Sequence, residues 1–174
     1  MITNWEKVSE EPYKAGYRKM FRRKYKMPDG RIEEYDIKAE GNCACILALT
    51  PNNEVILAKQ FRPGPEKVLM ELPGGGSSDN DENPEGAAKR EFLEETGFSG
   101  DFHLVNKCWN CGYSDRVTYN FVATNCKKVQ DQKLDETEFI EVVLLPLNEF
   151  KELLKTGELT DSKTAFYGLD YLGL

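Results

Sequence analysis

Three glutamates near the middle of the chain, Glu91, Glu94 and Glu95, have the spacing of a metal site on one side of a helix. At about 100° per residue, these positions fall within an arc of roughly 100°. Carboxylates so close together repel one another and destabilise a helix unless a cation neutralises them. Carboxylate oxygens are hard ligands that suit Mg²⁺ or Mn²⁺. The spacing indicates a divalent-cation site, although a Glu-x-x-Glu-Glu pattern by itself is more often a solvated acidic face.

The residues around these glutamates predict a helix from about Pro84 to Thr96. Asn83 is a good N-cap, and the proline after it suits the first helical turn. Gly97 suits the position just after the last turn. Ala88 and Phe92 lie beside the acidic arc and are expected to face the core.

A longer pattern includes this helix. Gly76, Glu82 and the segment Arg90-Glu91-Phe92-Leu93-Glu94-Glu95-Thr96-Gly97 have the spacing of the Nudix signature. Seven fixed positions would match by accident on the order of once in 100,000 such chains. The one departure is Phe92, where an aliphatic residue is usual. The chain therefore resembles Nudix hydrolases, which implies metal-assisted cleavage of a diphosphate linked to an organic group.

Outside the signature, residues 17–172 resemble the ADP-ribose pyrophosphatase branch of that family. The resemblance implies an α/β (α+β) Nudix fold, with a mixed β-sheet sandwiched between helices and an N-terminal antiparallel β-hairpin. It implies cleavage of ADP-ribose to AMP and ribose 5-phosphate, with GDP-mannose or another nucleotide sugar as the alternative substrate. The shared segments are Lys59-Gln60-Phe61-Arg62-Pro63, Met70-Glu71-Leu72-Pro73-Gly74-Gly75, Gly112-Tyr113-Ser114-Asp115, Glu138-Phe139-Ile140-Glu141-Val142 and Asp161-Ser162-Lys163-Thr164.

The resemblance also implies a metal-ligand set. Glu91, Glu94 and Glu95 would hold Mg²⁺, which Mn²⁺ can replace, and a main-chain carbonyl of Gly75 would add a ligand. Glycine permits such a close backbone approach. The branch usually has Pro-Ala-Gly here, one residue shorter, so Gly74 stays open as the alternative carbonyl.

Catalytic roles follow from the same resemblance. Glu95 and Arg90 belong to the catalytic set, Arg90 by orienting the helix carboxylates through an ion pair. Glu82 would be a further carboxylate near the metal. Glu138, in a polar stretch late in the chain, matches the position that often supplies a catalytic carboxylate, and Glu136 is the alternative general base.

The resemblance implies substrate contacts for Arg62 and for Gly112. Whether Arg62 reaches the substrate across a dimer interface stays open. The branch tends to carry proline where this chain has Cys111, which leaves the sugar preference open. Aromatic residues of the N-terminal part often stack on adenine in this branch. Three are available here, namely Trp5, Tyr13 and Tyr17.

Composition limits the classes of function. The chain has 174 residues and a net charge of −7, which suits one core-forming domain and disfavours general binding to nucleic acid or anionic membranes. No apolar run is long enough to span a membrane, and the first residues lack the apolar core of a signal peptide, so the cytoplasm is expected. We expect residues 1–40 to form the hairpin segment, a candidate dimerisation element, and residues 41–174 the Nudix domain. A homodimer is expected.

Two other classes of function stay open. The first is a Nudix module that binds a nucleotide sugar without cleaving it, which the intact acidic helix disfavours. The second is an RNA-decapping or nucleotide-pool-cleaning enzyme that uses the basic segment 18–26 as its RNA contact. The negative net charge disfavours the second.

The five cysteines are predicted to be free thiols, because their number is odd and the compartment is expected to be reducing. Cys43 and Cys45 should share one face of a strand as small buried residues. Cys108 and Cys111 form one half of a zinc pattern for which no second pair follows.

The other strands and helices of the chain must hold the acidic helix in position. Strands are predicted at 17–27 and 31–39, joined at Pro28-Asp29-Gly30. A second hairpin is predicted from 43–49 and 54–61 around Pro51-Asn52-Asn53. Further strands are expected at 69–72, 102–109, 117–124 and 139–145, with a polar loop at 125–138. Helices are expected at 147–154 and up to about residue 172, the last capped by Thr160 or Asp161.

Overall fold

The computed structural model describes residues 5–16, 18–76 and 83–174. The chain divides into two compact units, one of residues 1–42 and 109–117 and the other of residues 43–108 and 118–174. The segment 109–117, expected within the larger domain, therefore groups with the N-terminal residues. Among the described residues, no helix is long and apolar enough to span a membrane.

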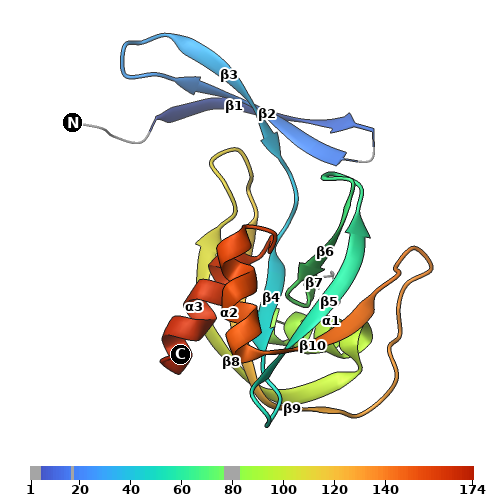
Figure 1. Cartoon of the computed structure of the whole chain (residues 1–174). Helices are drawn as coiled ribbons and strands as arrows, with labels where there is room; N and C mark the ends of the chain where they lie inside the picture. Colours follow the sequence, from blue (N-terminus) through green and yellow to red (C-terminus); the bar gives the residue numbers. More distant parts are fainter. Residues whose placement is uncertain (1–4, 17, 77–82) are drawn as a thin grey trace. The chain divides into compact units, whose positions relative to one another are not determined.

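The smaller unit is an antiparallel sheet of three strands (Figure 1), β1 (Glu6–Ala15), β2 (Arg18–Lys26) and β3 (Ile32–Lys38). The predicted hairpin corresponds to β2 and β3, and its turn is closed by a 2.9 Å hydrogen bond from Gly30 N–H to the Met27 carbonyl. β1 was not predicted. Its many charged residues have low strand propensity, so pairing with β2 is what makes it a strand.

The basic residues of β2 lie beside acidic partners on the neighbouring strands. Arg22 contacts Asp36 at 3.2 Å, and Lys24 contacts Glu34 at 2.8 Å. Arg23 also pairs with Glu10 of β1. This local compensation favours a solvated, ion-paired strand face over a patch for RNA.

The segment 109–117 is held to the end of β3 by backbone and side-chain hydrogen bonds. Lys38 N–H donates to the Tyr113 carbonyl at 2.9 Å, and Ser114 Oγ donates to Glu40 at 2.8 Å. The Arg116 guanidinium donates to the Glu40 carbonyl at 3.1 Å. These bonds explain why the segment belongs to the smaller unit.

The described residues of the larger unit form two sheets and three helices. One sheet is antiparallel, in the order β10 (Glu141–Pro146), β5 (Glu54–Arg62), β6 (Lys67–Glu71). The other is mixed, in the order β7 (Gly74–Gly76), β4 (Cys43–Ala48), β9 (Val117–Lys128), β8 (Phe98–Trp109), and in it β4 runs parallel to β9. The helices are α1 (Pro84–Thr96), α2 (Leu147–Thr156) and α3 (Ser162–Leu172).

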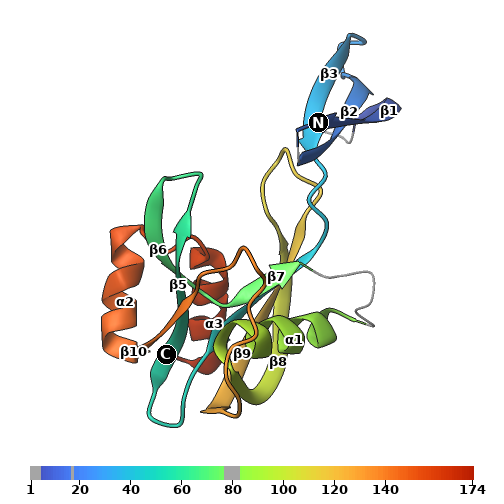
Figure 2. The ribbon, with the colours of Figure 1, turned by 90° about the vertical axis from the view of Figure 1, so that its right-hand side faces the viewer.

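The central strand β4 is buried on both faces, because successive side chains point in opposite directions. One face packs with Phe92 of α1 and the other with Leu169 of α3, so the helices cover opposite faces (Figure 2). This arrangement confirms the predicted α/β sandwich. The first face carries Ala44, Ile46 and Ala48, and the second carries Cys45, Leu47 and Leu49.

The predicted second hairpin is wrong. The turn at 50–53 forms, and a single bridge joins Leu49 to Val55, but β4 and β5 then enter different sheets. Both strands are apolar on both faces, so their pattern does not choose a pairing partner. The partners of β4 are instead β7 and β9, which lie later in the chain.

The cysteines are all free, as predicted. Cys45 and Cys126 are buried and Cys43 is partly buried, while Cys111 is exposed. Cys43 and Cys45 both lie on β4. Their surroundings are those of small core residues.

Candidate active site

The acidic helix α1 forms with the predicted ends. Asn83 Oδ1 accepts the Gly86 N–H at 2.8 Å, and Gly97 has a left-handed φ of 75° with its N–H bonded to the Leu93 carbonyl at 2.9 Å. Ala88 and Phe92 are fully buried against β4, as expected. Local capping therefore fixes the helix, and its apolar side fixes which way the glutamates face.

Glu95 is a buried carboxylate attached to the glycine strand β7. The Gly74 N–H donates to its Oε2 at 2.9 Å, and only 6% of the residue is exposed. Burial, followed by the charges of Glu91 and Glu138, raises the pKa of Glu95 to about 8. A buried carboxylate with this environment is stabilised by a nearby cation.

Glu91 lies against the next glycine. A Cβ added to Gly75 would stand 2.4 Å from the Glu91 Cδ, so a larger residue here would displace this carboxylate. Burial also raises the pKa of Glu91. Gly74 and Gly75 thus have different tasks, the first donating to Glu95 and the second allowing Glu91 to approach the backbone.

Arg90 joins two of the three glutamates. Its Nη1 lies 3.0 Å from an oxygen of Glu91 and 3.0 Å from an oxygen of Glu94. Its Nη2 donates to the Gly76 carbonyl at 3.5 Å. The ion pairs have the form that was predicted for an orienting arginine.

The carboxylates do not form a closed metal cage. Within residues 5–16, 18–76 and 83–174, no three acidic, histidine or cysteine side chains gather as a set that could hold a metal. Arg90 and the Gly74 N–H engage the three helix glutamates instead. Glu82, predicted to lie near the metal, falls outside the described residues.

The loop 129–140 brings a further carboxylate toward the helix. The charge of Glu138 contributes to the raised pKa values of both Glu91 and Glu95, and its own Oε2 accepts the Asp135 N–H at 3.0 Å. Glu136, the alternative base, is exposed and is not among the main causes of either shift. The structure therefore brings Glu138, rather than Glu136, into the electrostatic field of the helix glutamates.

Gln132 holds this loop against α1, a contact that the sequence did not suggest. Its Nε2 donates to the Glu95 carbonyl at 2.6 Å and to the Ile140 carbonyl at 3.1 Å. The Lys133 N–H also donates to the Glu94 carbonyl at 2.8 Å. These bonds satisfy carbonyls at the end of the helix, which have no partner inside it.

Arg62 ends β5, and its guanidinium lies against the buried carboxylate of Glu71. Thr160 also donates to Glu71, at 3.3 Å, and to Asp161, at 3.0 Å. Asp161 precedes α3 as predicted, but its side chain accepts the Leu72 N–H instead of capping the helix. Burial first, and then the charge of Glu71, raise the pKa of Asp161 to about 6.

Glu71 and Asp161 both lie in segments shared with the ADP-ribose pyrophosphatase branch, but no role near the site was predicted for either of them. The signal available was a carboxylate between apolar neighbours, as in Met70-Glu71-Leu72. Such a carboxylate at the end of a buried strand needs a partner. The partner could not be identified from the sequence, because Glu71 and Thr160 are 89 positions apart.

Two candidate substrate contacts lie in the smaller unit. Gly112 belongs to the turn in which Ser114 N–H donates to the Cys111 carbonyl at 3.4 Å. Of the aromatic candidates, Trp5 is exposed and lies 6.0 Å from Tyr35 between ring centroids. Tyr13 carries the Arg22 guanidinium over its ring, and Tyr17 lies outside the described residues.

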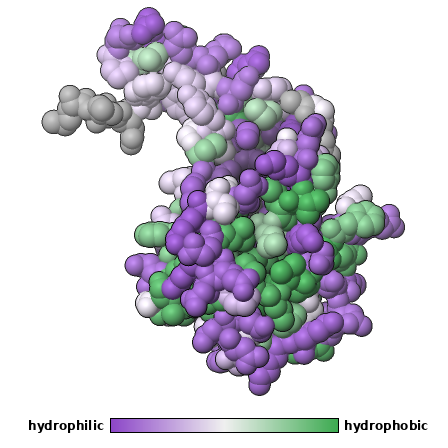
Figure 3. Space-filling view, in the orientation of Figure 1, coloured by the Kyte–Doolittle hydropathy of each residue, from purple (hydrophilic) through white to green (hydrophobic). Residues whose placement is uncertain are grey.

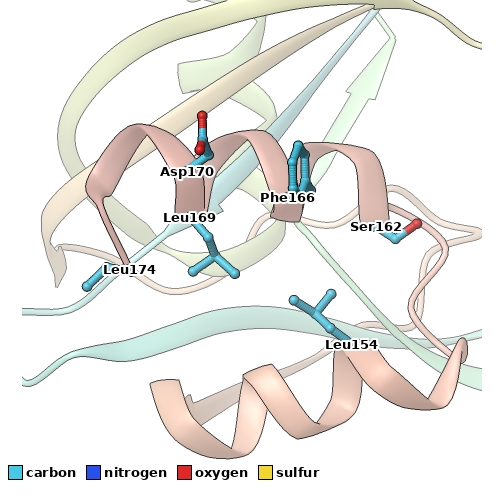
Figure 4. Close-up of a pocket in the computed structure, with 6 residues that line it drawn as sticks. All are labelled: Leu154, Ser162, Phe166, Leu169, Asp170 and Leu174. Atoms are coloured by element: carbon cyan, nitrogen blue, oxygen red, sulfur yellow. The ribbon is translucent and has the colours of Figure 1, made fainter.

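A separate apolar groove of about 390 Å³ lies between α2 and α3 (Figure 4). Leu154 of α2 faces α3 across it, and Asp170 is its one acidic side chain. No predicted site residue lines this groove. Its lining consists of Leu154, Ser162, Phe166, Leu169, Asp170 and Leu174.

Comparison with known proteins settles the family. A family model described as the NUDIX domain matches residues 39–165, which is more than half of the chain. The chain belongs to the Nudix family. This Nudix chain is 31% identical over 151 residues to an ADP-ribose pyrophosphatase of Bacillus subtilis (strain 168), covering 85% of this chain and 80% of that protein.

Other relatives and a solved structure agree with this placement. A GDP-mannose pyrophosphatase of Yersinia enterocolitica is 36% identical over 143 residues, covering 76% of this chain and 72% of that protein. A crystal structure of an ADP compounds hydrolase superposes with a TM-score of 0.82 at 19% identity, covering 99% of this chain and 96% of the other, which confirms the fold. The chain is a Nudix pyrophosphohydrolase that resembles ADP-ribose pyrophosphatases.

Proposed function

We propose that this Nudix enzyme hydrolyses the diphosphate bond of a nucleoside diphosphate sugar in the presence of Mg²⁺, and that ADP-ribose is its main substrate. The products would be AMP and ribose 5-phosphate. The observation that carries the proposal is the buried carboxylate of Glu95, fixed at 2.9 Å to the Gly74 N–H beside Glu91. The B. subtilis relative, named as an ADP-ribose pyrophosphatase, supports this choice of substrate.

The three helix glutamates supply hard oxygen donors of the kind that suits a divalent cation. Burial is the largest cause of the raised pKa values of Glu91 and Glu95, so a bound cation would stabilise their ionised forms beyond what Arg90 and the Gly74 N–H provide. Glu91, Glu94 and Glu95 would hold Mg²⁺, or Mn²⁺ in its place, with the Gly75 carbonyl as a further ligand. When bound, Mg²⁺ would neutralise phosphate oxygens and lower the pKa of a bound water.

The other side chains would divide the remaining tasks. Glu138 would accept the proton of the attacking water, which is supported by its electrostatic effect on the helix glutamates. Arg62 would bind the diphosphate through the part of its side chain that stays exposed. Arg90 would orient Glu91 and Glu94 before the substrate binds. Gly112 and an N-terminal aromatic residue would contact the sugar and adenine ends.

GDP-mannose is the alternative substrate, because one of the relatives above is named as a GDP-mannose pyrophosphatase. The catalytic steps would be the same, since both molecules carry a diphosphate between two organic groups. The difference would lie in the contacts to the base and the sugar.

We also propose a homodimer in the cytoplasm. The face in Figure 3 shows hydrophobic side chains gathered over the part of the larger unit that contains β5 and β6. Phe61 and Val68, which pair across these strands, are each 59% exposed. An exposed apolar pair next to Arg62 suits a subunit contact.

The deciding experiment compares wild type with Glu95→Gln on ADP-ribose, GDP-mannose, UDP-glucose, NADH and capped RNA, with and without Mg²⁺. Metal-dependent cleavage of ADP-ribose that is lost in the variant is the expected result. Preferred cleavage of GDP-mannose would replace the substrate and keep the mechanism. Tight binding without cleavage of any compound would contradict the proposal and indicate a binding module.

A further inference from the structure

The two edges of the Arg62 guanidinium differ in their surroundings. Its Nε donates to both oxygens of Glu71, at 3.0 and 2.8 Å, and Nη2 donates to the same carboxylate. Among the described residues, Nη1 has no hydrogen bond or ion pair of its own. The Arg62 side chain is 46% exposed, whereas that of Glu71 is 5% exposed. One edge is therefore fixed on a buried anion, and the Nη1 edge keeps its donors for a ligand.

Glu71 is itself held in place from two other directions. Gln60 Nε2 donates to it at 3.0 Å from strand β5, and Thr160 Oγ1 donates to it at 3.3 Å from the segment before α3. Gln60 and Arg62 lie two positions apart and so share one face of β5. A carboxylate with this many hydrogen-bond donors has a fixed orientation, and its bonds to Arg62 therefore fix the orientation of the guanidinium.

Arg62 also lies near the catalytic carboxylates. Its positive charge is among the effects that lower the pKa of Glu95, and the charge of Glu95 in turn raises the pKa of Arg62. Glu71 ends β6, and two residues later β7 begins at Gly74, whose N–H donates to Glu95. The fixed guanidinium is therefore within electrostatic range of the place where the diphosphate is expected to bind.

We propose that Glu71 is a positioning residue for substrate binding: by fixing the Nε and Nη2 edge of Arg62, it presents the Nη1 edge to the diphosphate. This inference rests on the proposed function, because it assigns Arg62 to the substrate. It differs from a purely structural role for Glu71, in which the buried ion pair only stabilises the end of the sheet. A preorganised arginine loses less side-chain entropy when the substrate binds.

The kinetic test uses ADP-ribose with Mg²⁺ and the variants Glu71→Gln, Arg62→Gln and the double variant. Glu71→Gln should raise KM by about tenfold and change kcat much less, because uniform binding is lost. In the Arg62→Gln background the same change should have no further effect on KM, since there is no arginine left to position. An equal increase in KM in both backgrounds, or no increase in wild type, would overturn the proposal.

Glu141→Gln is the matched control. Glu141 of β10 forms an ion pair at 2.9 Å with Lys59, which lies on the same strand as Arg62, but the Glu141 side chain is 67% exposed. This substitution should leave KM unchanged. Thermal unfolding of each variant shows whether Glu71→Gln is folded. If it is not, Gln60→Ala and Thr160→Val loosen Glu71 without removing its charge, and each should raise KM in wild type only. Unchanged KM in both would count against the proposal.

A binding experiment separates this inference from the proposed function. Titration calorimetry with ADP on the metal-free protein reports the diphosphate contact without any cleavage. ADP should bind more weakly to Glu71→Gln and to Arg62→Gln, and the double variant should be no weaker than Arg62→Gln alone. These differences in ADP affinity would support the positioning role of Glu71 even if the wild-type protein cleaved no nucleotide sugar. Equal ADP affinity in wild type and Glu71→Gln would overturn the inference while leaving the hydrolase proposal intact.

Discussion

The Gly74 N–H donates to Glu95 Oε2 at 2.9 Å, which joins the glycine strand to the last glutamate of the acidic helix. The bond stabilises the ionised carboxylate, yet burial outweighs it, and the pKa of Glu95 rises to about 8. The buried, ionised Glu95 therefore lowers the stability of the metal-free protein. Buried groups of this kind often mark functional sites.

Glu95→Gln should separate activity from stability. The variant should lose roughly 100-fold or more in kcat/KM with Mg²⁺, because a metal-binding carboxylate is lost. In chelator its melting temperature should rise above that of wild type at pH 8, since the amide keeps an acceptor for Gly74 and carries no buried charge. Glu85→Gln on the same helix is the control, because its exposed side chain pairs only with Lys89. A lower melting temperature for Glu95→Gln would contradict this reading of the site.

Gly75→Ala should impair the metal site. The new Cβ would meet the Glu91 carboxylate at 2.4 Å, so Glu91 must move. Because the new Cβ meets only the end of a flexible side chain, the loss of stability should be small, but the displaced carboxylate should raise the Mg²⁺ concentration for half-maximal activity. Gly76→Ala is a close control, since its Cβ would meet nothing within 4 Å. Mg²⁺ titrations of activity compare the two, and equal behaviour would refute the assignment.

The two candidate bases can be distinguished by kcat. Glu138→Gln should lower kcat by about 100-fold or more, the size expected for loss of a general base. Glu136→Gln should have little effect, because Glu136 is exposed and is not among the main causes of either raised glutamate pKa. Single-turnover measurements at saturating ADP-ribose decide between them. The reverse order of effects would assign the proton transfer to Glu136.

Gln132→Ala should loosen the loop that carries Glu138. It removes the hydrogen bonds to the Glu95 and Ile140 carbonyls, which costs about 1–3 kcal/mol if those carbonyls stay unsatisfied. We expect both a lower free energy of unfolding and a lower kcat. Gln130→Ala is the control, because Gln130 donates to the Gly97 carbonyl through its backbone N–H, which the substitution keeps. Urea unfolding and initial rates measure the two effects, and an unchanged kcat would show that the loop keeps Glu138 in place by other contacts.

Asp161 should make stability depend on pH. Its folded pKa of about 6 lies above the usual 3.8, so the folded state holds the proton more tightly than the unfolded state. The stabilising contribution is complete below about pH 4 and is lost as the pH rises through 6, by roughly 1–3 kcal/mol. Asp161→Asn keeps an acceptor for the Leu72 N–H and should gain stability over wild type at pH 7.5 but not at pH 3.5. Urea unfolding at both pH values provides the test, and an equal difference at the two pH values would exclude this titration.

The local parts of the site could be predicted from the sequence. The helix α1 was predicted from its caps and apolar positions, and both ends agree with the structure. The Nudix signature identified the glutamates and Arg90, because these residues lie within a few turns of one helix and need no knowledge of distant partners. The family comparison confirms the Nudix family, while the roles of these residues stay predictions.

The long-range relationships depended on the tertiary structure. The separation of β4 and β5 into two sheets, the strand identity of β1 and the contacts of Glu138 all involve partners far apart in the sequence. The network of Glu71, Arg62 and Thr160 shows the reason most clearly. Each of these residues is compatible with an exposed position in its own segment. The role of Glu71 follows only from the burial of its carboxylate and from the hydrogen-bond donors that two other segments bring to it.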